Sequence, residues 1–104
     1  MFPLILAVLA MEDGDVLARL QRREPQALAE LYDRYGGMVY RLALRIVRDS
    51  GIAEDLVQET FLRAWTARDT FRSDCSLATW LIRIALNLAR DHTRTGRFRF
   101  WKSV

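Results

Sequence analysis

The sequence predicts an all-α fold, a compact bundle of three to four helices. Apolar residues recur every three or four positions through most of the chain, which is the spacing of helices buried on one side. No stretch combines a sustained two-residue alternation with β-branched side chains, so a sheet is not expected. With 104 residues, 51% of them hydrophobic, the chain has enough apolar material for a single core.

Two helices are expected before residue 48. The first is short and covers about Asp15–Arg23. The second begins at Pro25, because proline suits the first turn of a helix, and its apolar spacing continues to Val47. The pair Gly36–Gly37 could bend or interrupt it, because each glycine costs a helix roughly 1 kcal/mol relative to alanine.

Two further helices are expected in the second half of the chain. A break at Asp49–Gly51 precedes a third helix over about Ile52–Arg68. A loop containing Phe71–Cys75 then leads to Ser76, a good N-cap for a fourth helix that ends near Thr95. On these two helices, the residues expected to face the core are Leu56, Val57, Phe61, Ala64, Leu81, Ala85, Leu88 and Ala89.

Both ends of the chain are expected to lie outside a helical domain of residues 15–97. Residues 1–14 form an extension that is expected to be flexible, and residues 98–104 form a basic tail toward a missing second domain. Met1–Ala10 is almost wholly apolar, but ten residues make a helix of only about 15 Å, half the hydrocarbon core of a membrane. A secretory signal requires a basic residue before its apolar run, and no basic residue precedes this one. We therefore expect a cytoplasmic protein with no membrane contact.

The composition excludes several kinds of site. Cys75 is the only cysteine and His92 the only histidine, so the chain cannot form an intramolecular disulfide, a multi-cysteine zinc site or a multi-histidine metal site. The carboxylates are not clustered to hold a metal, and no nucleophile–base pair or phosphate-binding loop is present. Neither catalysis nor a cofactor is expected, and His92 is expected at the surface.

Positive charge is concentrated at the C-terminal end. Up to Cys75, ten arginines stand against twelve carboxylates, a net charge of −2. From Ser76 onward, five arginines and Lys102 stand against Asp91 alone, a net charge of +5. A genome rich in G and C also produces an arginine excess, but explains its position less well. The asymmetry indicates that the C-terminal end meets a polyanion.

The third helix has a second face that the core does not need. We call it the acidic face, and its residues are Asp55, Gln58, Glu59 and Leu62. Leu62 is an apolar residue ringed by polar ones, which resembles the anchor and rim of a protein contact. A solvated helix face is the common alternative.

The fourth helix has a corresponding face of opposite charge. We call it the arginine stripe, and its residues are Trp80, Arg83, Asn87, Arg90 and Arg94. Arginines bind phosphates, an amide reads a base edge and an aromatic ring stacks on bases, so the stripe predicts a nucleic-acid contact. The alternative is a solvated basic face with Trp80 in the core.

The loop before the fourth helix is a third candidate site, with Phe71, Arg72, Ser73, Asp74, Cys75 and Ser76. Small polar residues and free backbone N–H groups at a helix N-terminus can form a pocket for a polar ligand. A turn and a helix cap explain Ser73, Asp74 and Ser76 equally well. Cys75 is interpreted as a residue that fills space in the packing rather than as a nucleophile, because no histidine lies near it in the sequence.

The segment Ala53–Trp65 (AEDLVQETFLRAW) closely resembles the most characteristic segment of bacterial sigma factors. Other segments resemble the extracytoplasmic-function group of these factors, namely Ala27–Tyr32, Val39–Ala43, Phe71–Arg72, Thr79–Leu81 and Arg83–Asn87. The similarity covers about Val16–Arg97, and the combined spacing is specific. It implies the helical bundle of sigma factor region 2.

The resemblance implies two partners, RNA polymerase core and promoter DNA. In the family, the segment like Asp55, Gln58, Glu59 and Leu62 docks on the clamp helices of the polymerase β′ subunit. The loop and the fourth helix meet the minus-ten promoter element and hold its non-template strand. The residues that this implies for DNA contact are Phe71, Arg72, Asp74, Cys75, Ser76, Leu77, Trp80, Arg83, Asn87, Arg90 and Arg94.

The resemblance also implies separate roles within the DNA-contacting set. A base unstacked from the duplex would enter a pocket at the loop, lined by Phe71, Arg83 and Asn87, which has to recover the few kcal/mol that unstacking costs. The last two arginines of the stripe would hold phosphates, and Trp80 would lie at the edge of the opening duplex. An anti-sigma protein would be a regulator, but no residue identifies one.

Two departures from the family pattern matter. Housekeeping sigma factors typically have two adjacent tryptophans where this chain has Trp80–Leu81. Leucine has no large π face, so promoter opening is expected to be less vigorous and to demand a closer promoter match. Family members also normally carry a second helical domain that reads the minus-thirty-five element, whereas this chain stops at Val104. It is either a dissected domain or an unusual one-domain member.

Three classes of function are therefore distinguished. The leading one is a promoter-recognition module that acts within the polymerase holoenzyme. The second is a sigma-like protein-interaction bundle with a regulatory role and no DNA reading, and the third is a membrane-surface protein that uses Met1–Ala10 and the basic tail. Salt-dependent binding to single-stranded minus-ten DNA separates the first two.

Overall fold

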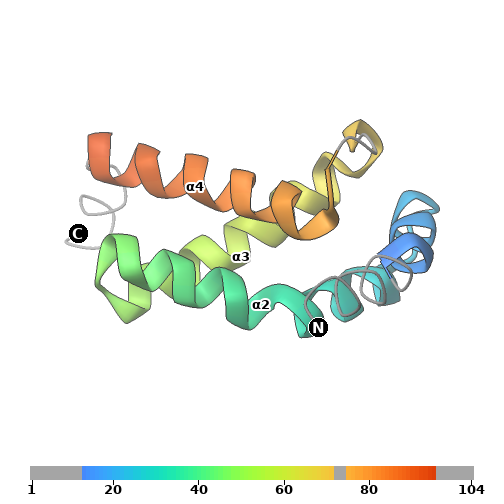
Figure 1. The fold of residues 1–104 in the computed structure, drawn as a ribbon, viewed down its shortest axis with the longest axis horizontal. Helices are drawn as coiled ribbons and strands as arrows, with labels where there is room; N and C mark the ends of the chain where they lie inside the picture. The colour runs from blue at the N-terminus through green and yellow to red at the C-terminus, as the bar shows by residue number, and fades with distance from the viewer. Residues whose placement is uncertain (1–12, 72–74, 96–104) are drawn as a thin grey trace, which may run out of the picture.

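The computed structural model describes residues 13–71 and 75–95, with side chains described as far as residue 93. A short helix at residues 13–21 is followed by α2 (Pro25–Val47), α3 (Ser50–Thr66), a 3₁₀ turn η1 (Arg68–Thr70) and α4 (Leu77–Thr95). The three long helices all contact one another, and the short helix lies beside the start of α2 (Figure 1). No strand occurs within the two described ranges, and the predicted all-α bundle is confirmed.

The glycine pair does not interrupt α2, which runs unbroken through Gly36 and Gly37. The helix ends at Val47, and the next residue, Arg48, caps it with a left-handed backbone (φ 54°) while its N–H donates to the Leu44 carbonyl at 2.8 Å. Packing of the apolar face of α2 against α3 and α4 outweighs the glycine cost, so the helix is not interrupted there.

Side-chain caps fix where α3 and α4 begin. The Asp49 carboxylate accepts a hydrogen bond from the Ile52 N–H at 2.9 Å, so α3 starts at Ser50, two residues before its predicted start. The Ser76 hydroxyl oxygen accepts from the Thr79 N–H at 3.1 Å, which confirms the predicted cap of α4. α3 ends at Thr66 rather than near residue 68, because the chain tightens there into η1.

The core lies where α2, α3 and α4 meet. All eight residues predicted to face it from α3 and α4 are at most 4% exposed. His92 is only 3% exposed, so its predicted surface position is wrong. It follows Leu88 and Ala89 by one helical turn, which places it on the buried side of α4.

The short helix is attached to α2 by both apolar and polar contacts. Val16 and Leu20 are buried in the core cluster. The carboxylate of Asp13, two residues before the predicted helix start, accepts hydrogen bonds from the Tyr35 hydroxyl at 2.5 Å and from Arg34 Nη1 at 2.7 Å. These contacts hold the short helix near Phe71, Cys75 and the first turn of α4, whose residues line one cavity with it.

None of the helices within residues 13–71 and 75–95 combines the length and apolarity that a membrane crossing requires. Met1–Ala10, for which we predicted no membrane contact, lies outside the described residues.

Candidate interfaces on α3 and α4

The acidic face occurs on α3 as predicted. Gln58 and Leu62 are exposed, and Asp55 and Glu59 are half-exposed. The Leu62 side chain is 58% exposed, the largest value among the big hydrophobic residues of the described chain. It adds no packing to the core, so its role in the fold is small. Whether the face binds polymerase stays a prediction.

Leu62 lies between two grooves. On the side of α2, a mostly apolar groove of about 430 Å³ is lined by Pro25, Leu28, Ala29, Tyr32, Gln58, Phe61 and Leu62. Tyr32 is held there by an edge-on contact with the ring of Phe61, at 5.1 Å between centroids. The acidic face is thus continuous with an apolar surface, which extends the area that a protein partner could bury.

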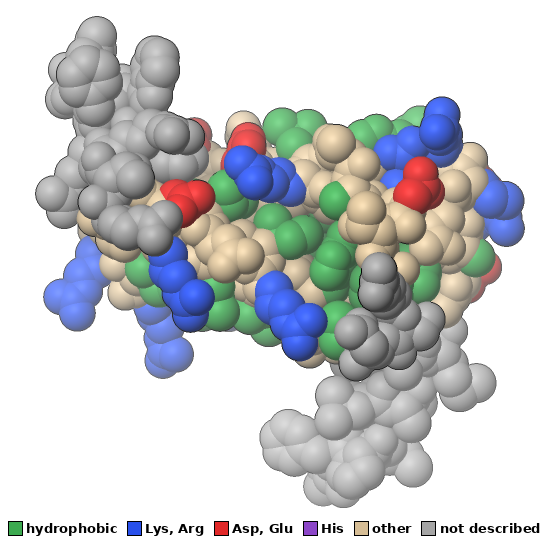
Figure 2. Space-filling model, turned by 90° about the horizontal axis from the view of Figure 1, so that it is seen from above, with side chains coloured by type: hydrophobic (Ala, Val, Ile, Leu, Met, Phe, Trp, Pro, Cys, Tyr) green, Lys and Arg blue, Asp and Glu red, His purple; other side chains and the backbone are tan. Residues whose placement is uncertain are grey.

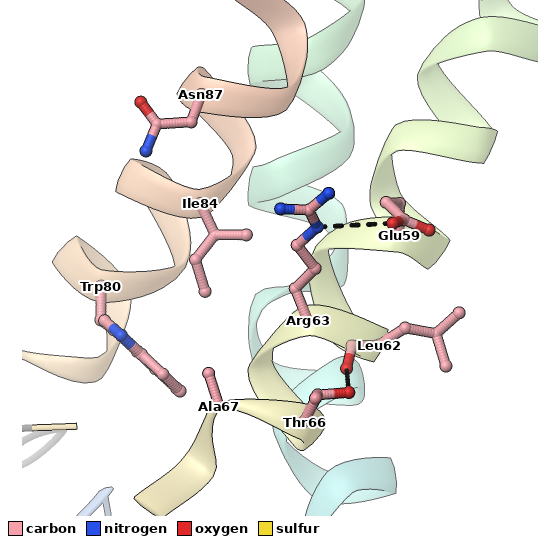
Figure 3. Close-up of a pocket in the computed structure, with 8 residues that line it drawn as sticks. All are labelled: Glu59, Leu62, Arg63, Thr66, Ala67, Trp80, Ile84 and Asn87. Atoms are coloured by element: carbon pink, nitrogen blue, oxygen red, sulfur yellow. Dashed lines mark hydrogen bonds and ion pairs between the residues drawn. The ribbon is translucent and has the colours of Figure 1, made fainter. Parts of the chain in front are cut away.

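The second groove separates α3 from α4. It has a volume of about 640 Å³ and is lined by Glu59, Leu62, Arg63, Thr66, Ala67, Trp80, Ile84 and Asn87. In Figure 3 the Leu62 side chain points away from α4, whereas the Arg63 guanidinium extends into the space between the helices. We call this space the α3/α4 groove. It brings residues of the acidic face and of the arginine stripe to opposite walls of one depression.

Four lining residues of the α3/α4 groove were not predicted as functional: Arg63, Thr66, Ala67 and Ile84. The sequence carries one signal for them. Arg63 follows Glu59 by four positions, so the two side chains are neighbours on one helix face, with Arg63 Nε 3.4 Å from Glu59 Oε1. The orientation of α4, which closes the groove, has no such local signal.

The arginine stripe is on the outside of α4. Arg83, Asn87 and Arg90 are exposed, while Trp80 is half-buried and its ring packs edge-on against Phe71, 5.2 Å between centroids. Figure 2 views the molecule from the side of α4 and shows more Lys and Arg than Asp and Glu side chains on that face. The side chain of Arg94 lies outside the described residues.

The loop before α4 forms a separate, smaller cavity. The described loop residues Phe71, Cys75 and Ser76 line about 300 Å³ together with Leu77 and with Asp13, Gly14 and Leu17 of the short helix. Arg83 reaches this loop, with Nη1 3.8 Å from the Cys75 Sγ. Asn87 does not line the cavity and belongs to the α3/α4 groove instead. Arg72, Ser73 and Asp74 lie outside the described residues.

Two buried leucines change the predicted site. Leu77, predicted as a DNA contact, is only 2% exposed, because it faces the core from the first turn of α4. A side chain buried in this way is not available for a direct contact in this structure, and a contribution of Leu77 to DNA binding stays a prediction. Leu81 is fully buried, so the missing π face at this position is not presented to a DNA strand. Weaker promoter opening by this chain stays a prediction.

Comparison with known proteins identifies the family. Residues 31–99 match the model of sigma-70 region 2. Similar curated proteins include the RNA polymerase sigma-H factor of Pseudomonas aeruginosa, 37% identical over 78% of this chain and 42% of the relative. The ECF RNA polymerase sigma factor BldN of Streptomyces coelicolor is 41% identical over 82% of this chain and 33% of the relative. The chain thus spans less than half the length of these relatives.

Two solved structures share the fold. One is an engineered region 2 of sigmaE in complex with GTAAAA, with 36% identity and a TM-score of 0.75 over 84% of this chain and 90% of that one. The other is an RsbN–BldN complex, with 40% identity and a TM-score of 0.70 over 76% of this chain and 58% of that one. Together with the three-helix core and the signature segment on α3, these matches show that the chain belongs to the sigma-70 region 2 family and resembles its extracytoplasmic-function members.

Proposed function

We propose that this chain is the promoter-recognition domain of a sigma factor. It binds RNA polymerase core through the acidic face of α3 and reads the minus-ten element of a promoter, as a non-template single strand, through α4 and the loop before it. The observation that carries the proposal is the pair of outward-facing surfaces on adjacent helices, one with Leu62 among acidic residues and one with Asn87 among arginines.

The polymerase contact is supported by the chemistry of the acidic face. An exposed leucine surrounded by Gln58, Glu59 and Asp55 matches a partner that offers an apolar pocket within a basic rim. We propose the clamp helices of the β′ subunit as that partner. The adjoining apolar groove on the α2 side adds area to the same contact.

The DNA contact is supported by the position of Asn87. Its amide is exposed at the wall of the α3/α4 groove, one helical turn from Arg90 and two from Trp80. An amide can form paired hydrogen bonds with a base edge, and the neighbouring arginines neutralise phosphates. Changing Asn87 should therefore alter the preference for a DNA sequence, whereas changing the arginines should alter the affinity for all sequences.

Binding of fluorescent single-stranded oligonucleotides tests the proposal. The probes are GTAAAA flanked by random bases, a scramble of the same composition, and a pool of randomised hexamers, measured alone and with polymerase core. We expect sequence-dependent binding that weakens steeply as salt rises. Asn87→Ala should reduce discrimination between preferred and scrambled sequences by about 5- to 100-fold, whereas Gln26→Ala, an exposed amide on α2, should not.

Equal binding to all sequences in the presence of polymerase core would contradict the proposal and favour a sigma-like protein-interaction bundle.

The proposed activity needs no catalysis and places the protein in the cytoplasm, where polymerase acts. The relative BldN has been solved in complex with RsbN. We propose that a regulatory protein of anti-sigma type binds this chain as well.

A further inference from the structure

The α3/α4 groove connects the two proposed interfaces. Glu59 belongs to the acidic face, whereas Trp80 and Asn87 belong to the arginine stripe, and all three line the groove. Arg63 lies between them and belongs to neither predicted surface. Among the lining residues of this groove, Glu59 and Arg63 alone are charged.

The ion pair between these two residues is loose. Arg63 Nε and Glu59 Oε1 are 3.4 Å apart, at the long end of hydrogen-bond geometry, and both side chains are more than a third exposed. Exposed pairs four residues apart on a helix contribute little to stability, because water screens them. Arg63 can therefore leave the Glu59 carboxylate and bind another anion at small cost to the stability of the fold.

The geometry of the groove indicates which anion this is. Asn87 and Trp80 line the α4 wall of the groove, and the Arg63 guanidinium lies on the α3 wall, so a strand read by Asn87 and Trp80 would run along the groove past Arg63. We propose that Arg63 binds a backbone phosphate of that strand, and that Glu59 competes with the phosphate for Arg63. This inference rests on the proposed function and adds a DNA ligand on α3.

The arrangement couples the two partners of the domain. When a basic surface of polymerase engages Glu59, the carboxylate no longer holds Arg63 or repels a phosphate, so DNA binds more tightly. Linkage requires that DNA in turn tightens the binding of polymerase. The coupling passes through two side chains on one helix face and needs no change of fold.

Equilibrium binding by the whole chain tests the inference, with the GTAAAA probe and its scramble at several salt concentrations. Arg63→Gln should weaken binding of both probes about three- to tenfold and reduce the slope of log K against log salt by about 0.7, as expected for one lost phosphate contact to a single strand. Glu59→Gln should tighten binding about two- to fourfold. In the double variant the gain from Glu59→Gln should disappear.

Matched variants separate a local contact from a change in net charge. Arg45→Gln on α2 removes a positive charge, and Glu54→Gln on α3 removes a negative charge, both at exposed positions outside the groove. If Arg63→Gln has no larger effect than Arg45→Gln, the inference is overturned, while the proposed function still stands on the selectivity lost in Asn87→Ala. Lower polymerase affinity for Arg63→Gln with unchanged DNA affinity would also overturn it. If the wild-type chain with polymerase core present binds GTAAAA, its scramble and every sequence of the randomised pool equally, the proposed function itself fails.

Discussion

The most exposed large hydrophobic residue of α3 is Leu62, and its neighbours on the outer face of the helix are charged or polar. Helical periodicity alone predicts that Leu62 faces away from the core, because it falls on the opposite side from Leu56 and Phe61. Periodicity does not reveal that its side chain is next to two grooves, since those depend on how α2 and α4 pack. Residue-level prediction therefore succeeds for the direction of a side chain and fails for its surroundings.

Leu62→Arg should lower the affinity for RNA polymerase core about 10- to 100-fold, the range of a central interface anchor. The change puts a cation against the basic surface that we propose as partner. Ile46→Arg is the matched control, because Ile46 is also an exposed large hydrophobic residue but lies on α2. Competition binding to purified core measures both. Equal effects of the two variants would remove the acidic face as the docking site.

Asp13→Ala should lower the free energy of unfolding by about 1–3 kcal/mol, because the buried carboxylate accepts hydrogen bonds from Tyr35 and Arg34. Asp15→Ala serves as the comparison, since this exposed carboxylate makes only an ion pair with Arg19 on its own helix. Urea denaturation followed by circular dichroism gives both values. A loss no greater than that of Asp15→Ala would show that the Asp13 cluster does not stabilise the fold.

The four helical elements of the described chain were located from proline, caps and apolar spacing, with boundaries displaced by about two residues. The displacements have local causes, such as the Asp49 cap that starts α3 early. The possible interruption at Gly36–Gly37 does not occur, because tertiary packing decides helix continuity in a folded domain. The predicted surface position of His92 followed from its residue type. Its position one helical turn after Leu88 and Ala89 instead puts it on the buried side of α4.

Gly37→Ala should raise the free energy of unfolding by about 0.5–1 kcal/mol, because alanine has the higher helix propensity and restricts the unfolded chain. The position is exposed, and an added Cβ would meet only the Arg41 guanidinium, 3.3 Å from Nη1, which is free to move. Thermal unfolding of the variant beside the wild type measures the effect. A lower melting temperature would mean that α2 requires the flexibility of glycine here.

The whole molecule depends on contacts between elements that no single helix predicts. The pattern of the sequence showed two charged surfaces and supplied the family, but not the groove that joins them, since it arises from the packing of α4 beside α3. The separation of Asn87 from the loop cavity also became visible only in three dimensions. One-dimensional patterns fix which side of a helix faces outward, whereas the neighbours on that side belong to the assembled bundle.

Stability should fall in acid partly through Glu30, which joins α2 to the short helix by accepting hydrogen bonds from Arg19, at 3.0 Å between Nη1 and Oε1. The hydrogen bond from the Arg19 guanidinium holds the pKa of Glu30 below its ordinary value of 4.5. A carboxyl with a lowered folded-state pKa contributes stability above pH 4.5, and this contribution is lost as the pH falls through the folded-state value. Glu30→Gln should therefore be less stable than wild type near pH 7, with the difference shrinking below pH 4.5. Denaturation midpoints measured across this range test the prediction, and a constant difference at every pH would contradict it.

The burial of Leu81 restricts how such a domain can be altered by mutation. A tryptophan at this position has to fit among the side chains that already enclose Leu81 between α4 and its neighbours. Overfilling a packed interior costs about 1–3 kcal/mol, so the substitution made alone would yield a strained protein. Mutations that first enlarge the interior would therefore make a second adjacent indole less costly, so the order in which the changes occur matters.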